Sequence, residues 1–76
     1  MTAATVQAEL RAAVEEVAAA FDALPSSLQE RIGEPIRYGL DAEVEAATAA
    51  DDDERALAAI RAWRRHWLAT FEEASR

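Results

Sequence analysis

The stretch "ALAAIRAWRRHWLATFEEA", residues 56–74, decides the fold of this chain. On a helix that turns about 100° per residue, its large apolar side chains form one broad stripe, and most of its charges lie on the other side. Such a stripe is typical of a helix that packs against other helices, so the stretch predicts an all-α protein. The stripe contains Ala56, Leu57, Ile60, Trp63, Trp67, Leu68, Phe71 and Ala74.

Two upstream segments carry similar apolar seams. In the first, residues 3–24, large apolar residues follow one another in steps of three and four, as an amphipathic helix requires. In the second, residues 27–50, a seam runs through Ile36, Leu40, Val44 and Ala47. The first seam consists of Val6, Leu10, Val14, Val17, Phe21 and Leu24.

The second segment is interrupted at Gly33–Pro35, because glycine weakens a helix and proline lacks a backbone donor. We expect either a short helix followed by another from Pro35, or one kinked helix. Ser27 and Glu30 have the spacing of a capping box, which predicts the start of this segment. The chain is therefore expected to be one domain, residues 1–76, folded as an all-α bundle of three main helices at about 3–24, 27–50 and 53–74.

The composition excludes several classes of protein. The net charge of -7 repels nucleic acid and anionic membranes and favours encounters with a basic surface. The 76 residues include no cysteine, which rules out disulfides and thiolate metal sites. The longest apolar run, "VAAAF", is much too short to span a membrane. We therefore expect a cytoplasmic protein that binds neither membrane nor nucleic acid directly.

No catalytic motif emerges from the sequence. His66 is the single histidine and falls on the polar side of its helix, while Ser26 and Ser27 belong to no nucleophile motif. The acidic run near residue 50 lacks the spacing and the glycine of an EF-hand loop. We expect no enzymatic activity, no cofactor and no metal.

Charge is divided sharply along the chain. Residues 41–54 contain seven acids and no base, and residues 55–71 contain four arginines and no acid. If the last two helices form an antiparallel hairpin, Asp41 and Glu45 come level with Arg61 and Arg65 or their neighbours, and much of this basic patch is then neutralised within the protein. Carboxylates at residues 51–54 are also suited to capping the last helix.

Arg64 stands apart, because it lies inside the apolar stripe. This position predicts a partly buried guanidinium that needs a carboxylate, from Asp22, Glu34 or Asp41, or from a partner chain. Trp63 and Trp67 share the stripe and are interpreted as core residues, although in so small a chain the core and a subunit interface can be one surface.

These features favour a non-enzymatic module that binds a basic protein partner. The acidic segment would steer the encounter, while Tyr38, which falls off its helix seam, and Arg64 or Arg65 would anchor the complex. Two alternatives stay open: a structural homo-oligomer and a helix-turn-helix DNA-binding regulator, the second less favoured by the charge. The candidate partner-binding residues are Tyr38, Asp41, Glu45, Asp51, Asp52, Asp53, Arg64 and Arg65.

Residues 24–67 also resemble a family pattern. Leu24-Pro25, Tyr38-Gly39-Leu40 and Trp63-Arg64 are similar to the Leu-Pro, Tyr and Trp-Arg pattern of short, uncharacterised actinobacterial proteins that are antitoxin-like. This resemblance implies a protein that binds and silences a basic nuclease-type toxin of the RelE/ParE kind. Tyr38, Trp63 and Arg64 match the pattern, which attaches no role to them, whereas the Gly33–Pro35 break and Trp67 depart from it.

Overall fold

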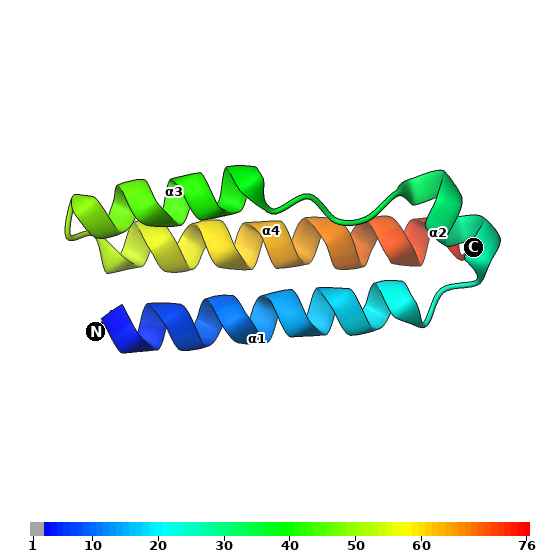
Figure 1. The fold of residues 1–76 in the computed structure, drawn as a ribbon, viewed down its shortest axis with the longest axis horizontal. Coiled ribbons are helices and arrows are strands. Elements are labelled where there is room, and N and C mark those ends of the chain that lie inside the picture. The colour runs from blue at the N-terminus through cyan, green and yellow to red at the C-terminus, as the bar shows by residue number, and fades with distance from the viewer. Residues whose placement is uncertain (1–2) are drawn as a thin grey trace.

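The computed structural model describes residues 3–76, which form four helices and contain no strand (Figure 1). The all-α prediction is therefore confirmed. Of the two alternatives for the broken middle segment, the structure has a short helix followed by another, so the helices number four rather than three. The helices are α1 (Ala3–Asp22), α2 (Ser26–Ile32), α3 (Tyr38–Ala49) and α4 (Asp53–Ala74).

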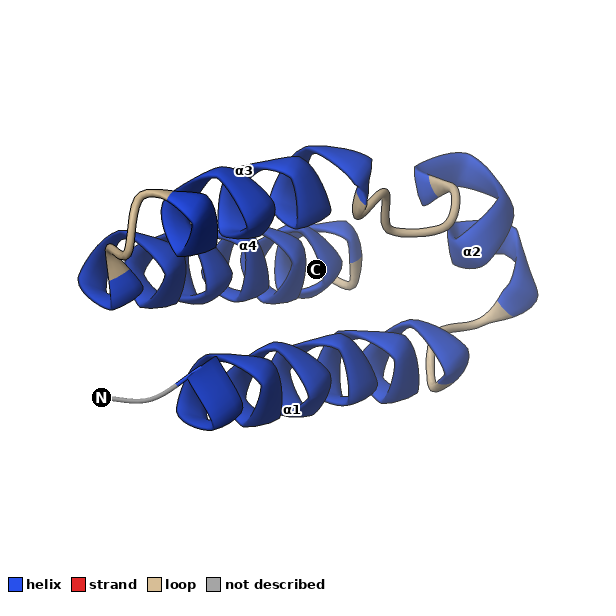
Figure 2. Ribbon diagram, turned by 60° about the vertical axis from the view of Figure 1, so that its left-hand side comes forward, coloured by secondary structure: helices blue, strands red, loops and turns tan. Residues whose placement is uncertain are grey.

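The bundle is long and narrow, with extents of 41 × 17 × 15 Å. Helix α4 packs against both α1 and α3, which contact each other far less. Figure 2 shows these three helices running roughly side by side, with α2 as a short link at one end. None of the four helices between Ala3 and Ala74 combines the length and the apolar character that a membrane span needs.

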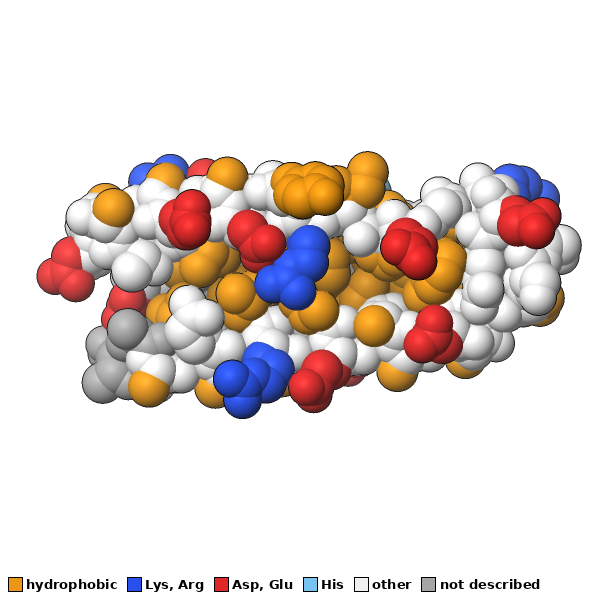
Figure 3. Space-filling view, in the orientation of Figure 1, with side chains coloured by type: hydrophobic (Ala, Val, Ile, Leu, Met, Phe, Trp, Pro, Cys, Tyr) orange, Lys and Arg blue, Asp and Glu red, His pale blue; other side chains and the backbone are white. Residues whose placement is uncertain are grey.

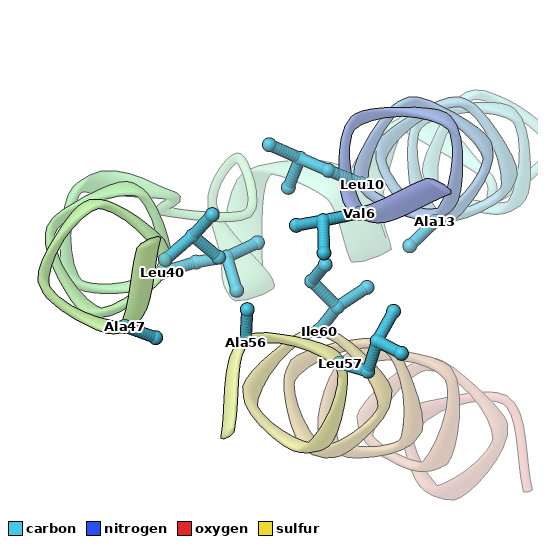
Figure 4. Close-up of a cluster of buried hydrophobic side chains, with 9 residues drawn as sticks. Val6, Leu10, Ala13, Leu40, Ala47, Ala56, Leu57 and Ile60 are labelled. Carbon is cyan, nitrogen blue, oxygen red and sulfur yellow. The ribbon is translucent and has the colours of Figure 1, made fainter. Parts of the chain in front are cut away.

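One half of the molecule contains a core shared by all three long helices, which we call the three-helix core. Its side chains point from α1, α3 and α4 into a common centre (Figure 4). Ala47 and Ala56 are completely buried, and their small side chains let α3 and α4 approach closely. The core consists of Val6, Leu10, Ala13, Leu40, Val44, Ala47, Ala56, Leu57 and Ile60.

The other half has a smaller core next to α2. It consists of Val17 and Phe21 from α1 and Phe71 from α4, and the two phenylalanine rings lie 5.9 Å apart between centroids. Trp63 packs against both cores, while Trp67 packs against this one. Both tryptophans are half-buried, so the stripe predicted for residues 56–74 does face the interior, with its two tryptophans at the edge.

The break in the middle segment is longer than predicted. Gly33 has φ 79° and ψ 161°, a conformation open essentially to glycine, and it directs the chain away from the axis of α2. Helix α3 then starts at Tyr38 rather than Pro35. Ile36, which was expected on the apolar seam, is consequently 64% exposed. We call the non-helical residues 33–37 the strap.

The connection between α1 and α2 also differs from the prediction. Helix α2 begins at Ser26 after Pro25 with no side-chain cap, so the expected capping box at Ser27 is wrong. The side chain of Gln29 instead forms hydrogen bonds with the end of the preceding helix, α1. Its Nε2 donates to the carbonyl oxygens of Phe21 at 2.9 Å and Leu24 at 3.1 Å, which satisfies backbone acceptors at the end of α1.

The turn between α3 and α4 is closed by its own backbone. Asp51 has a left-handed φ of 56°, and the next amide, that of Asp52, donates to the Ala47 carbonyl at 2.8 Å. The Asp52 carboxylate accepts a hydrogen bond from the Arg55 amide at 3.1 Å. The prediction that an aspartate of this run caps the last helix is confirmed for Asp52.

Candidate partner-binding surface

The structure divides the candidate residues between three places. Tyr38, Asp41 and Glu45 belong to α3, and Asp51 to Asp53 form the turn and the start of α4. Arg64 and Arg65 lie on the side of α4 that faces α1. The three groups therefore have to be assessed separately.

Arg64 finds its carboxylate on α1. Its guanidinium forms two hydrogen bonds with Glu16, of which the one from Nη2 to Oε1 measures 3.0 Å. The predicted partners Asp22, Glu34 and Asp41 are wrong, because the long arginine side chain leaves the apolar stripe and reaches across to the neighbouring helix.

The Glu16–Arg64 pair remains in contact with water, since both side chains are nearly half exposed. The hydrogen bond from Arg64 lowers the pKa of the Glu16 carboxyl below its ordinary value, and the positive charge of Arg64 acts in the same direction. Arg64 is thus engaged within the protein, on the α1 side of the bundle.

Arg61 and Arg65 line the same side, in a hollow of about 540 Å³ between α1 and α4 that also includes Glu9 and Glu72. The expectation that Asp41 and Glu45 neutralise these arginines is wrong, because the two arginines face α1 rather than α3. Asp41 pairs instead with Arg37, four residues earlier, at 3.2 Å.

The seven acids of residues 41–54 are not equivalent. Asp41 pairs with Arg37, Glu43 pairs with Arg55, and Asp52 caps α4. No ion pair within residues 3–76 involves the remaining four. We call these four the free acids; they are Glu45, Asp51, Asp53 and Glu54.

A groove runs between α1 and α3 on the opposite side from Arg64. Figure 3 shows apolar side chains along its floor and acidic side chains on both of its sides, with one basic side chain in the middle of the groove and another on its α1 side. Where the strap replaces α3, the groove deepens into a pocket of about 240 Å³. The pocket is lined by Val14, Val17, Ala18, Phe21, Asp22, Glu34, Pro35, Arg37 and Trp63.

Trp63 fixes the strap to α4. Its indole Nε1 donates a hydrogen bond of 2.8 Å to the carbonyl oxygen of Ile36. Beyond that carbonyl the strap leads directly into α3, where Tyr38 is 84% exposed. Ile36 and Tyr38 therefore present a pair of exposed apolar side chains next to the groove.

The single histidine lies on the surface and takes part in no metal-binding group of the described residues. His66 is exposed, and its ring lies edge-on to Trp67 at 5.3 Å between centroids. In residues 3–76 no group of three or more histidine, cysteine, aspartate or glutamate side chains is placed to hold a metal ion. The candidate site is accordingly a surface with free acids, exposed apolar groups and a pocket.

Sequence reasoning missed the pocket. The sequence signal for it was the Gly33–Pro35 break, which removes one helical layer opposite the apolar seam of α1. A break by itself does not show which apolar surface stays uncovered beside it. No protein-family model, curated protein or solved structure matches this chain, and the resemblance to antitoxin-like proteins stays a prediction.

Proposed function

We propose that this protein is a non-enzymatic acidic module that binds a basic protein partner. The observation that carries the proposal is the set of free acids, Glu45, Asp51, Asp53 and Glu54, which no arginine of residues 3–76 neutralises. Charges without an internal partner are available to a partner molecule.

The electrostatic field supports the same proposal. With a net charge of -7 on 76 residues, the protein attracts a basic surface over a distance of about one Debye length, roughly 8 Å at physiological ionic strength. Such steering accelerates association and weakens as salt is added. A basic nuclease-type toxin, or another protein with a nucleic-acid-binding surface, has the required charge.

Tyr38 is the best candidate for an anchor in this complex. It is 84% exposed and stands at the start of α3, on the same helix as Glu45. Tyrosine contributes strongly to interfaces, because it buries a large ring while keeping a hydroxyl for hydrogen bonding. Arg64 is a weaker candidate than the sequence suggested, since Glu16 already holds its guanidinium.

The proposal is tested with the chain as bait in a lysate at low salt, followed by calorimetry with each purified captured protein. We expect a basic protein whose affinity falls by roughly tenfold or more when the free acids become Gln and Asn. The matched control neutralises four other acids that belong to no ion pair within residues 3–76, and it should change affinity far less. These control positions are Glu9, Glu15, Glu30 and Glu73.

A thermal melt of both quadruple variants ensures that the comparison is between folded proteins. Equal loss of affinity in both variants would show that only net charge matters, and capture of no basic protein would contradict the proposed function.

One observation favours a second candidate, a structural homo-oligomer. The apolar floor of the groove between α1 and α3 is a surface that a second copy could cover (Figure 3). Light scattering separates the two candidates: a monomer favours the partner-binding module, and a dimer that persists on dilution favours the oligomer.

A further inference from the structure

We propose that the pocket beside the strap receives an apolar side chain from a basic amphipathic helix of the partner, and that lysine or arginine residues of this helix pair with Asp22 and Glu34. This inference rests on the proposed function and names the contact site and the chemistry of the occupant.

The pocket exists because one layer of the bundle is missing at this level. Helix α3 starts only at Tyr38, so the surface between α1 and Trp63 is bordered by the strap instead of a helix. The hydrogen bond from Trp63 to the Ile36 carbonyl holds the strap in place and keeps the pocket open. The pocket of about 240 Å³ that remains is large enough for one side chain of a helix from another molecule.

The walls of the pocket are apolar. Val14, Val17 and Phe21 contribute from α1, and Trp63 contributes from α4. Val14 and Trp63 are half-buried, so an apolar side chain that enters the pocket would remove their remaining surface from water.

The rim of the pocket is acidic. Asp22 and Glu34 lie on two sides, and within residues 3–76 neither carboxylate belongs to an ion pair. Arg37 also lines the pocket, but both of its hydrogen bonds to Asp41 hold its guanidinium there, at 3.2 Å each. An occupant with a cation on each side of an apolar group would match this rim.

The charge also distinguishes between possible occupants. A second copy of the chain would bring a net charge of -7 to a rim that is already acidic, and an anionic membrane would be repelled in the same way. A basic helix is attracted by the rim, and the long stems of lysine and arginine would cover apolar surface around the pocket.

The test uses a synthetic helix of about 15 residues with a leucine seam and lysines elsewhere, and a scrambled peptide of the same composition without a seam. Binding is measured by calorimetry and by the fluorescence of Trp63 in a Trp67→Phe background. Ala18→Phe fills the pocket from an exposed position on its wall. Ala19→Phe, also exposed but outside the pocket, is the matched control.

We expect the seamed peptide to bind more tightly than the scrambled one and to change the Trp63 emission. Ala18→Phe should weaken this binding by roughly tenfold or more, and Ala19→Phe by less than about twofold. Replacing Asp22 by Asn and Glu34 by Gln should weaken binding at low salt, whereas the control Glu15→Gln with Glu30→Gln should change it far less.

Other results would overturn the inference in distinguishable ways. If both peptides bind equally and only neutralisation of the free acids weakens them, the proposed function stands and the pocket is not its contact site. If neither peptide binds at low salt while a basic protein is captured from the lysate, the inference is wrong and the proposed function stands; if neither the peptides nor any basic protein binds, both proposals fail. If the protein is a dimer that Ala18→Phe converts to a monomer, the occupant is a second copy and the inference is wrong.

Discussion

The same pair of helices, α1 and α4, is covered by a helix in one half of the molecule and by the strap in the other. In the first half α3 completes the three-helix core, and Val6 and Ile60 are each 1% exposed. In the second half Leu24 and Trp67 remain half-buried and Ile36 is 64% exposed. The difference shows that the place where α3 begins decides which apolar surface is buried and which stays in contact with water.

The largest difference between the two halves should appear when an isoleucine is shortened. Ile60→Ala is expected to lower the free energy of unfolding by about 2 to 5 kcal/mol, because it leaves a cavity in the three-helix core. Ile36→Ala should change it by less than about 0.5 kcal/mol, because the side chain is already in water. Urea denaturation measures both, and similar losses would contradict this division.

The two glycines should respond in opposite directions to alanine. Gly33→Ala is expected to cost about 1 to 3 kcal/mol, because φ 79° with ψ 161° strains any residue that has a Cβ. Gly39→Ala should raise stability by up to about 1 kcal/mol, since that glycine is helical and nothing lies within 4 Å of the added Cβ. Thermal unfolding of both variants tests the strap geometry. An unchanged melting temperature for Gly33→Ala would contradict it.

The attachment of the strap can be loosened without removing an aromatic ring. Trp63→Phe deletes the indole donor that binds the Ile36 carbonyl and should cost about 0.5 to 1.5 kcal/mol for the hydrogen bond alone. Hydrogen exchange should then accelerate at the amides of Gly33 and Asp41, which bond to the Gln29 and Arg37 carbonyls at the two ends of the strap, and change little in the three-helix core. Uniform acceleration would mean that Trp63 stabilises the whole bundle and does not hold the strap in particular.

The smallest effect concerns Glu16 and Arg64, at the level of the pocket but on the other side of the bundle. Arg64 lowers the pKa of Glu16 in the folded state, so the pair contributes stability above the ordinary pKa of a glutamate, about 4.3. That contribution is lost as the pH falls through the lowered folded-state value. The test is the free energy of unfolding measured from neutral to acid pH. In Glu16→Gln this free energy should fall slightly less steeply as the pH decreases than in the unchanged protein. An identical slope would show that the pair contributes nothing to stability.

The half that contains the three-helix core could be predicted from the sequence, because the spacing of its apolar residues shows which of them share a helix face. The last helix has the predicted bounds, 53–74, and the first ends at Asp22 instead of residue 24. Leu40, Val44 and Ala47 are buried as their seam predicted. These helices are long enough for the three- and four-residue spacing of their apolar residues to show which face is buried.

The half beside the strap, which we call the open half, could not be predicted, because its structure depends on the path of a short non-helical segment. Periodicity gave Ile36 a place on a seam, but a seam exists only where the chain is helical. The partner of Arg64 was missed for a related reason. A helical wheel shows where a side chain starts, whereas a flexible arginine can end on a neighbouring helix 48 residues away in sequence.

The most direct test of binding through the open half is an amide and indole NMR spectrum of the labelled chain, recorded while the seamed basic peptide is added. We predict shifts concentrated in the second half of α1, in residues 33–38 and at the indole N–H of Trp63, with the hollow around Arg61 and Arg65 unaffected. Shifts confined to that hollow or to residues 51–54, with the Trp63 indole unmoved, would contradict it.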